Sequence, residues 1–388
     1  MAAKNCSIII INRFFGGAQT PTGRMASDFV DKLLADGHQV SVLTSRSSYT
    51  SGEMPSYDKR INMHFAKSRR NAGRLESWLG FWLQTLILLP ILRWHRCIIM
   101  TDPPFLIFAG AIAKSIHPRR KLYWWTMDLY PEALIASNLI FFGKSLVNKI
   151  CSWLTNASIT KMNGVICLGH TQKHLLMKYE NWPKHDPTFA IVIPPWDFRQ
   201  IVPTTEGAKQ FKNDMGWGNK KIALYAGNLG EAHSYEYILR LAKESAAQDD
   251  NSWLFSFFCR GAKVPELKEK ASNLPNVIVS DYLPEDKSEL LLAAADLHII
   301  SMSDGWEGIV VPSKLYGVLN TTAPVLFIGP KKADTAIEID SLEIGWSVNN
   351  EDDVYQTMDK LKNLGTRLSV PIDTKTLDDM LIFVMNEA

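Results

Sequence analysis

Long apolar runs, a strong charge imbalance and paired cysteines are all missing from this sequence. Its most apolar stretch, residues 78–94, is interrupted by Gln84 and Pro90, so it is shorter than the roughly 20 residues that a membrane-spanning helix needs. The formal net charge is only +2, from 42 basic and 40 acidic residues, which gives no reason to expect nucleic acid as a partner. The five cysteines are scattered without CxxC spacing, so we expect reduced thiols rather than disulfides or a zinc site.

Three further absences narrow the function. No signal peptide is expected, because a β-branched strand pattern begins at Ser7, and we therefore expect a cytoplasmic protein. No GxGxxG motif follows a strand, which disfavours a dinucleotide-dependent dehydrogenase. His170 and His174 share one helix face, but no third metal ligand accompanies them, so we expect no metal site there.

The sequence does contain repeated strand–helix–strand units. A strand at residues 7–12, a helix at 25–36 and a strand at 39–44 form the first unit, and such units build parallel, doubly wound sheets. Further strands are predicted at residues 97–100, 122–125, 165–168, 191–193, 221–225, 253–259, 276–279, 297–301 and 324–328. A chain of 388 residues fits two domains of ordinary size.

We place the domain linker after Pro194 and Pro195, in a turn-rich stretch with few core residues. The expected domains are an acceptor-side domain at 1–198 and a nucleotide-sugar-binding domain at 199–372. A C-terminal helix within 373–388 is expected to pack back on the first domain.

Two glycine turns occupy corresponding places in the two halves. Gly16 and Gly17 follow the first strand of the first half, and Gly227 to Gly230 follow the first strand of the second half. Glycine there lets backbone N–H groups approach a phosphate, and a helix N-terminus follows. A single turn of this kind is usually only a tight turn, whereas one in each half indicates a pair of phosphate-facing loops.

The order of several motifs resembles family 4 glycosyltransferases, in particular the bacterial branch that assembles O-antigen, capsule and exopolysaccharide. The motifs are FFGGAQT, DGHQVSVLTS, TDPP, MDLYPE, GNLGEAHS, CRGAKVPELKE, NVIVSDYLPEDKSELLLAAAD and GIVVPSKLYG followed by PVLFIGP. The resemblance extends from about Ile8 to Asn350. It implies the GT-B fold, an α/β architecture of two Rossmann-like domains facing across a cleft, with net retention of anomeric configuration and no metal or other cofactor.

The resemblance also assigns residues to a nucleotide-sugar donor. Gly16, Gly17 and Asn228 would face the donor diphosphate. Arg260 and Lys263 would offset the charge of the leaving diphosphate, although two solvated loop cations are an equally good interpretation.

Around residue 310 the sequence both matches the family and departs from it. Glu307 stands where the family carries the first glutamate of its pair, near the donor sugar, but Gly317 takes the place of the second, which usually binds ribose. Ser313, Lys314 and Tyr316 are our substitutes for holding the nucleotide. Ser313 also suits a helix N-cap.

On the acceptor side, Asp128 and Glu132 follow the strand LYWW and are candidates to orient or deprotonate an acceptor hydroxyl. For Glu132, a solvent-facing structural role is the favoured alternative. His233 in GEAHS matches the family motif and suits either a donor contact or a capping role.

We therefore expect a hexosyl- or N-acetylhexosaminyltransferase that moves a sugar from a nucleotide, UDP by family habit, to a glycan or lipid-linked acceptor of surface polysaccharide synthesis. Two alternatives stay open: a nucleotide-sugar 2-epimerase of the same fold, and a non-catalytic partner subunit. Residues 78–94 are interpreted as a buried helix. The alternative is peripheral contact with the inner face of a membrane, helped by Lys67, Arg69, Arg70 and Arg74.

Overall fold

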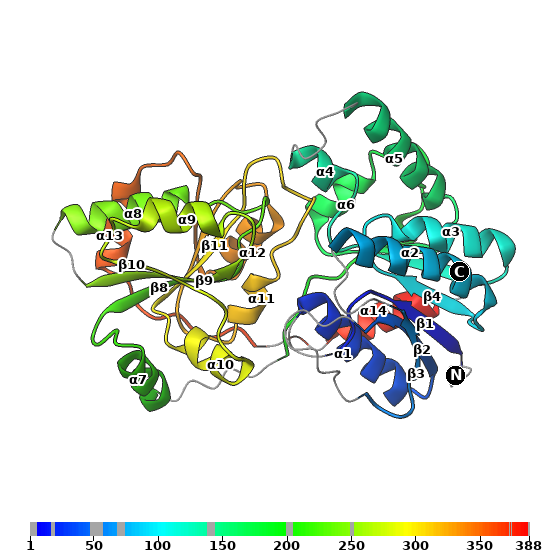
Figure 1. Ribbon diagram of the computed structural model, residues 1–388, viewed down its shortest axis with the longest axis horizontal. Helices are drawn as coiled ribbons and strands as arrows, with labels where there is room; N and C mark the ends of the chain where they lie inside the picture. Colours follow the sequence, from blue (N-terminus) through cyan, green and yellow to red (C-terminus); the bar gives the residue numbers. More distant parts are fainter. Residues whose placement is uncertain are drawn as a thin grey trace. The chain divides into compact units, whose positions relative to one another are not determined.

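The computed structural model describes residues 6–16, 20–46, 57–67, 74–137, 144–198, 205–248, 252–371, 373 and 375–386. The chain forms two compact units (Figure 1). Unit 1 comprises Met1–Pro195, Gly308–Val311 and Asp373–Ala388, and unit 2 comprises Trp196–Glu307 and Pro312–Ile372. Both units are α/β structures built around a parallel sheet.

The sheet of unit 1 has seven strands in the order β3-β2-β1-β4-β5-β6-β7, all parallel. They are β1 (Ser7–Ile11), β2 (Gln39–Ser45), β3 (Asn62–Ala66), β4 (Arg96–Ile99), β5 (Lys121–Trp125), β6 (Gly164–Cys167) and β7 (Ala190–Val192). The central strands read as continuous apolar runs because helices cover both faces of the sheet. The chain changes direction along the sheet between β1 and β4, which makes that place the topological switch point.

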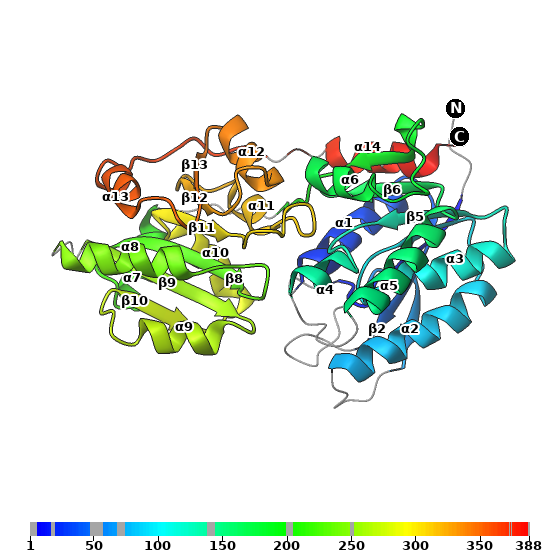
Figure 2. The same cartoon turned by 90° about the horizontal axis from the view of Figure 1, so that it is seen from above.

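The helices of unit 1 lie on both faces of its sheet. They are α1 (Pro21–Ala35), α2 (Arg74–Ile91), α3 (Leu106–Ile116), α4 (Glu132–Ala136), α5 (Lys144–Ile159), α6 (His170–Leu176), the 3-10 turn η1 (Pro187–Phe189) and α14 (Lys375–Met385). Helices α2, α3 and α5 lie side by side on one face, and α1 and α14 lie on the other (Figure 2). The C-terminal α14 contacts unit 1 through Phe383, whose ring packs against Tyr123, and through Met385, whose carbonyl accepts from Arg96.

The sheet of unit 2 has six parallel strands in the order β10-β9-β8-β11-β12-β13, with its switch point between β8 and β11. They are β8 (Lys221–Asn228), β9 (Trp253–Arg260), β10 (Val277–Ser280), β11 (Leu297–Ser301), β12 (Val325–Ile328) and β13 (Gly345–Val348). The helices are α7 (Thr205–Asp214), α8 (Glu236–Ala247), α9 (Val264–Ala271), α10 (Glu285–Ala293), α11 (Lys314–Val318), α12 (Asp334–Ser341) and α13 (Val354–Lys362).

The core of unit 2 has two layers, one on each face of its sheet. Along β9, Phe255 and Phe257 enter one apolar cluster, whereas Leu254 and Phe258 enter another. Successive side chains of a strand point to opposite faces, so one strand supplies both layers. All four side chains are buried.

The strands predicted from the sequence are confirmed within one to three residues at each end. Two strands were missed. β3 has only one fully buried residue, and β13 is a four-residue edge strand of mixed polarity, so neither shows the apolar pattern of a central strand. The return of Gly308–Val311 to unit 1 was also not foreseen.

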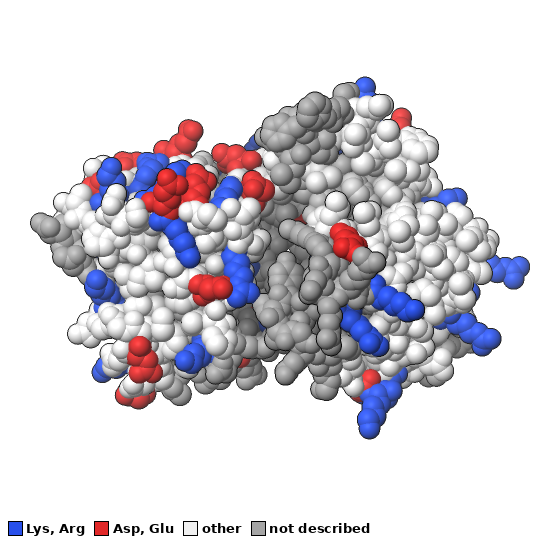
Figure 3. Space-filling model, in the orientation of Figure 1, with Lys and Arg blue, Asp and Glu red and all other residues white. Residues whose placement is uncertain are grey.

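The two units differ in surface charge. In Figure 3, acidic and basic side chains are intermingled on unit 2, whereas the visible surface of unit 1 is largely uncharged, with basic side chains along its margin. None of the helices that the structure describes combines the length and apolarity needed to cross a membrane.

Candidate functional site

The switch point of unit 2 gathers most of the residues assigned to the donor. β8 ends at Asn228 and β11 ends at Ser301, and these two strands are neighbours. In open parallel sheets, the crevice beyond the carboxyl ends of the strands at the switch point is where ligands bind. The loops after β8 and β9 and the N-terminus of α11 meet at this edge.

Lys314 crosses the turn that follows β8. Its ammonium Nζ donates to the phenol oxygen of Tyr225 at 2.6 Å and to the carbonyl oxygen of Asn228 at 2.9 Å. The ammonium also lies 4.2 Å from the centre of the Tyr225 ring. Gly227 makes this path possible, because a Cβ at that position would lie 2.6 Å from Lys314 Cε. Gly227 also has a φ of 131°, which side-chain-bearing residues rarely adopt.

His233 and Lys263 are joined in the same loop cluster. The ring nitrogen Nδ1 of His233 lies 2.6 Å from the carbonyl oxygen of Ser301, and Lys263 Nζ donates to the carbonyl of His233 at 2.6 Å. Since a carbonyl only accepts, Nδ1 carries the proton and Nε2 is an acceptor. Burial, with the charges of Lys314 and Lys263 acting in the same direction, lowers the pKa of His233 to about 3, so the ring is neutral.

Arg260 differs from the two lysines because a carboxylate neutralises it. Its guanidinium is paired with Asp281, with Nη2 donating to Oδ2 at 3.0 Å, and it stacks over the Tyr282 ring at 5.1 Å. Hydrogen bonds from Arg260 lower the pKa of Asp281. Both side chains are largely exposed, so Arg260 is a weaker candidate for an anion contact than Lys263 or Lys314.

Lys263 and Lys314 bring two lysine ammonium groups to the switch point. Their ammonium groups contact carbonyl oxygens and a phenol, and within the described part of the chain neither has a carboxylate partner. Burial lowers the pKa of Lys314 to about 7, because the charged form is poorly solvated there. An anion with several oxygens, such as a diphosphate, would restore that solvation, and the edge is therefore arranged as an anion site.

The other donor candidates lie at α11 and in the segment before Gly308. Ser313 occupies the N-cap position of α11, but its side chain makes no capping hydrogen bond. Tyr316 is buried, and its hydroxyl donates to Glu338, which raises the pKa of Tyr316 together with burial. Glu307 is half-buried at the end of unit 2, immediately before Gly308.

The switch point of unit 1 is filled by an ion pair. Arg13 Nε and Nη2 donate to Asp102 Oδ1 and Oδ2 at 3.1 and 3.2 Å, and the Arg13 backbone N–H donates to the Asp102 carbonyl at 3.0 Å. The Arg13 side chain is only 9% exposed. Gly16, with a φ of 69°, belongs to the loop beyond this pair, and Gly17 lies outside the described residues.

A glutamine holds the segment that carries Asp128. Gln172 is fully buried, and its side chain contacts Thr126 Oγ1 at 2.6 Å, the Met127 carbonyl at 2.7 Å and the Leu168 N–H at 2.8 Å. Asp128 follows directly and is exposed. The next N–H, of Leu129, donates to the carbonyl of Ile309 at 2.9 Å, so the returning segment 308–311 packs beside Asp128.

Glu132 has a structural partner. Tyr179 donates to Glu132 Oε1 at 2.6 Å, and burial raises the pKa of Glu132. The pKa of Tyr179 is raised as well, by burial and by this carboxylate. Glu132 is therefore less accessible than Asp128. His170 and His174 are both exposed on α6.

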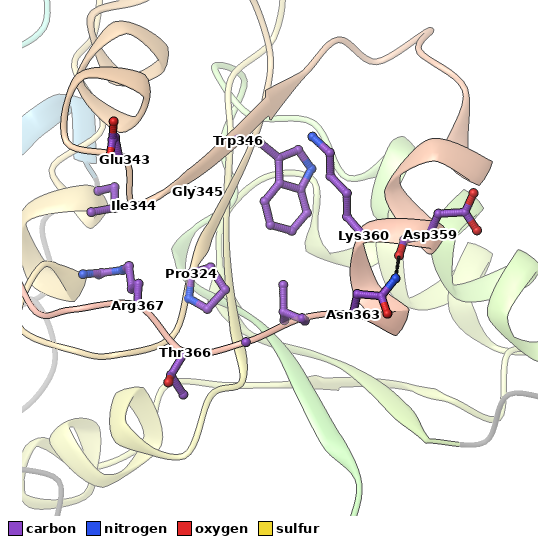
Figure 4. Close-up of a pocket in the computed structure, with 12 residues that line it drawn as sticks. Pro324, Glu343, Ile344, Gly345, Trp346, Asp359, Lys360, Asn363, Thr366 and Arg367 are labelled. Carbon is purple, nitrogen blue, oxygen red and sulfur yellow. Dashed lines mark hydrogen bonds between the residues drawn. The ribbon is translucent and has the colours of Figure 1, made fainter.

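A hollow of about 590 Å³ lies at the opposite edge of the unit 2 sheet. It is lined by Pro324 and Gly345, which stand at the amino ends of β12 and β13, and by Trp346, Lys360 and Arg367 (Figure 4). The Arg367 guanidinium donates to the carbonyls of Val318, Leu319, Ala323 and Leu368, so it closes the C-terminal end of α11. Since ligands of such sheets bind at the carboxyl edge, this hollow is not our candidate site.

Three parts of the site escaped sequence analysis: Tyr225 beneath Lys314, Gln172 beneath the Asp128 segment, and the Arg13–Asp102 pair. Tyr225 reads as one more apolar strand residue, and its hydroxyl also donates to the Asn228 carbonyl at 2.9 Å. The other two depend on residues 46 and 89 positions apart. The one sequence signal for the ion pair was Asp102 in the motif TDPP, which follows a strand.

Two tandem Rossmann-like units, each built on a parallel sheet, define a GT-B fold. No protein-family model matches the sequence. The chain is 22% identical over 365 residues to WbjE of Pseudomonas aeruginosa, named as a glycosyltransferase, covering 89% of this chain and 86% of WbjE. It is 22% identical over 330 residues to WcaI of Escherichia coli K12, named for colanic acid biosynthesis, covering 77% of each.

Solved structures show the same fold. WaaG, a glycosyltransferase involved in lipopolysaccharide biosynthesis, superposes with a TM-score of 0.65 at 14% identity, covering 97% of this chain and 92% of WaaG. A UDP-forming trehalose-phosphate synthase from Burkholderia vietnamiensis gives 0.63 at 10% identity, covering 98% and 96%. A UDP-N-acetylglucosamine 2-epimerase from Listeria monocytogenes gives 0.57 at 11% identity, covering 97% and 95%.

Proposed function

We propose that this protein is a retaining glycosyltransferase of surface polysaccharide synthesis. It transfers a hexosyl or N-acetylhexosaminyl group from a UDP-sugar to a hydroxyl of a glycan or lipid-linked acceptor. Unit 2 binds the donor, and unit 1 binds the acceptor. The two relatives in sequence are both named as glycosyltransferases, which supports this class over others of the same fold.

The observation that carries the proposal is the pair of lysines at the unit 2 switch point. In the described part of the chain, the hydrogen bonds of Lys263 and Lys314 go only to neutral groups. The Lys314 ammonium donates a short hydrogen bond to the Tyr225 hydroxyl. A diphosphate supplies the missing negative charge. As the donor bond breaks, negative charge grows on this leaving group, and fixed cations stabilise it without reorganising. We therefore assign to these lysines the role that a metal ion plays elsewhere.

The proposed step occurs on one face of the sugar. The bond between the sugar C1 and the diphosphate oxygen breaks, and a bond from the acceptor oxygen to C1 forms on the same side. The acceptor proton passes to the departing phosphate oxygen, so no enzyme nucleophile is required. Asp128 orients the acceptor hydroxyl, and Glu307 and His233 Nε2 accept hydrogen bonds from the donor sugar.

The uridine base is proposed from the family resemblance and from the UDP-forming synthase among the structural neighbours. Gly317 offers no side chain for the ribose, so we assign the ribose contact to the start of α11, at Ser313 and Lys314. Tyr316, which we also predicted to bind substrate, would first have to leave Glu338.

A non-catalytic partner subunit is the second candidate, favoured by the same Gly317. Such a subunit would keep the lysine site and lose turnover. A nucleotide-sugar 2-epimerase is the third candidate, because one structural neighbour is named as such an enzyme. The same experiments test it.

The first experiment is a thermal-shift panel of UDP-, GDP-, ADP- and TDP-sugars, each with magnesium and with EDTA. A ligand that binds only the native state raises the apparent stability. We expect one nucleotide class to shift the transition without metal, and the shift to disappear in Lys314→Ala and to weaken in Glu307→Ala.

The matched control is Lys243→Ala, which removes an exposed lysine of helix α8. No shift with any nucleotide sugar, from protein whose circular dichroism shows an intact fold, would overturn the donor site. Binding without sugar transfer to membrane extracts would favour the partner subunit, and interconversion of the donor sugar without an acceptor would favour the epimerase.

A further inference from the structure

Helix α2 is apolar on two sides, and only one of them is covered. Phe81 and Leu89 are 2% and 0% exposed and face the core of unit 1. On the other side, every fourth residue is an exposed aliphatic side chain: Leu75, Leu79, Leu83, Ile87 and Ile91, between 52% and 73% exposed. The expectation of a buried helix is therefore right for one face only. A helix that is apolar all round normally has an apolar neighbour on each side.

The exposed apolar surface continues onto the neighbouring helices. α2 packs against α3, and α3 packs against α5 (Figure 2). α3 exposes Ile112 and Ile116, and α5 exposes Leu146, Val147, Ile150 and Trp153 at helical spacing. Trp153 is 65% exposed. We call these three helices and their exposed apolar side chains the apolar face. Monomeric soluble proteins rarely leave a contiguous surface of this kind uncovered.

Most of the charged residues on and beside these three helices are basic. In the sequences of α2, α3 and α5 the only acidic residue is Glu76, whereas the helices carry Arg74, Lys114, Lys144 and Lys149. The exposed Arg93 and Arg119 follow α2 and α3. This surface therefore combines exposed aliphatic groups with a basic border, and what covers it must be both apolar and anionic.

We propose that the apolar face docks on a bilayer containing anionic lipids. The aliphatic side chains enter the boundary between headgroups and acyl chains, Lys149, Arg93 and Arg119 attract the anionic headgroups, and Trp153 lies at the headgroup level, where tryptophan is favoured. A second copy of the chain fits less well. In a two-fold dimer the same surface meets itself, so the basic borders of both copies would repel each other.

This proposal goes beyond the transfer reaction and does not depend on it. It makes the protein a peripheral one that rests on the membrane by one face of unit 1. Binding to lipid is measured without nucleotide sugar or acceptor, so failure of the donor site and failure of the apolar face are separate results.

The test is flotation of the full-length protein with liposomes. One set contains phosphatidylcholine alone, and the other contains about one third phosphatidylglycerol, which supplies the negative surface potential. We expect flotation with the anionic set and little with the neutral set. The variant Leu79→Gln/Leu83→Gln/Ile87→Gln should lose binding at least about tenfold, because three exposed apolar groups are removed. Arg93→Glu/Arg119→Glu/Lys149→Glu should lose the preference for anionic lipid.

The matched control is Leu290→Gln/Ile337→Gln/Leu368→Gln, which makes the same change at three exposed positions of unit 2 and should bind like the unchanged protein. All substituted positions are exposed, so the variants should fold, as checked by their thermal transitions. Equal flotation of the α2 variant and the control would overturn the proposal. So would a dimer, seen by light scattering, that the α2 substitutions dissociate, because a second copy would then cover the face.

Discussion

The two switch points of this protein have the same topology and opposite contents. In unit 1, the space beyond β1 and β4 is closed by Arg13 and Asp102, whose charges neutralise each other. In unit 2, the space beyond β8 and β11 holds Lys314 and Lys263, which contact neutral groups. The fold builds the same kind of sheet edge twice, and the side chains at the two edges differ in their hydrogen-bond partners.

This difference is the basis of our proposal that the donor binds at the edge of unit 2. A paired arginine has no need of a further anion, whereas a lysine held against a phenol and a carbonyl does. What unit 1 offers instead is acidic: Asp128 is exposed at its carboxyl edge, on a segment fixed by Gln172. Hydroxyl groups rather than phosphates suit that edge.

The largest effect on donor binding is expected from Lys314→Ala. Losing a charged hydrogen bond to phosphate costs about 1.5 to 3 kcal/mol, so UDP should bind roughly 10- to 100-fold more weakly. Isothermal titration with UDP measures the change, and Lys243→Ala is the control. Unchanged affinity would remove the contrast between the two switch points.

Asp128→Asn tests the acceptor edge. We expect sugar incorporation into a membrane lipid extract to fall about 100-fold, in the range that misplacing a reacting group costs, while UDP affinity stays the same. Glu132→Gln should change incorporation less than about threefold, because Tyr179 already occupies that carboxylate. Equal losses in both variants would contradict the assignment of Asp128.

Arg13→Ala should act on stability and not on the donor. Removing one partner of a largely buried pair takes away the cation that faces Asp102, and we expect the free energy of unfolding of unit 1 to fall by about 2 kcal/mol, after discounting for the partial exposure of Asp102. Urea titration measures this, and UDP titration should show no change. A large loss of UDP affinity would mean that the unit 1 switch point also binds donor.

Donor affinity should depend on pH through Lys314. Its pKa of about 7 lies below that of a free lysine, so the ammonium loses its proton above pH 7, and binding of an anion then requires proton uptake. The dissociation constant of a UDP-sugar should rise up to about tenfold per pH unit above 7 and be flat below. Lys314→Arg keeps a permanent charge and should abolish the slope; a slope that persists in this variant would assign the titration to another group.

The smallest effect is expected from Gly227→Ala. A Cβ there would lie 2.6 Å from Lys314 Cε, and the φ of 131° is unfavourable for alanine, so the lysine side chain should shift and UDP affinity fall a few-fold. Gly37→Ala is the control, because its φ of 83° is strained too but no atom lies within 4 Å of the added Cβ. Thermal stability should fall in both variants, and UDP affinity only in the first.

Sequence analysis predicted the regular parts of this protein better than the site. The central strands, such as β1 and β8, could be predicted because helices bury both faces of the sheet and the strands are therefore apolar runs. The edge strands β3 and β13 carry no such pattern. Motif order placed Lys314, Lys263 and His233 in loops at one sheet edge, but it did not show that Tyr316 is turned onto Glu338 or that Arg260 is paired with Asp281.

The sequence by itself determined two α/β units, the positions of their central strands along the chain and the loops that carry the basic residues, because periodicity and glycine turns are local properties. Only the tertiary structure decided which of those residues keep an uncompensated charge. Three features depend on residues far apart in the chain: the pairing of Arg13 with Asp102, the contact of Lys314 with Tyr225, and the exposure of one face of α2. The free energy of each charged group is set by its burial and by the neighbours that folding brings to it.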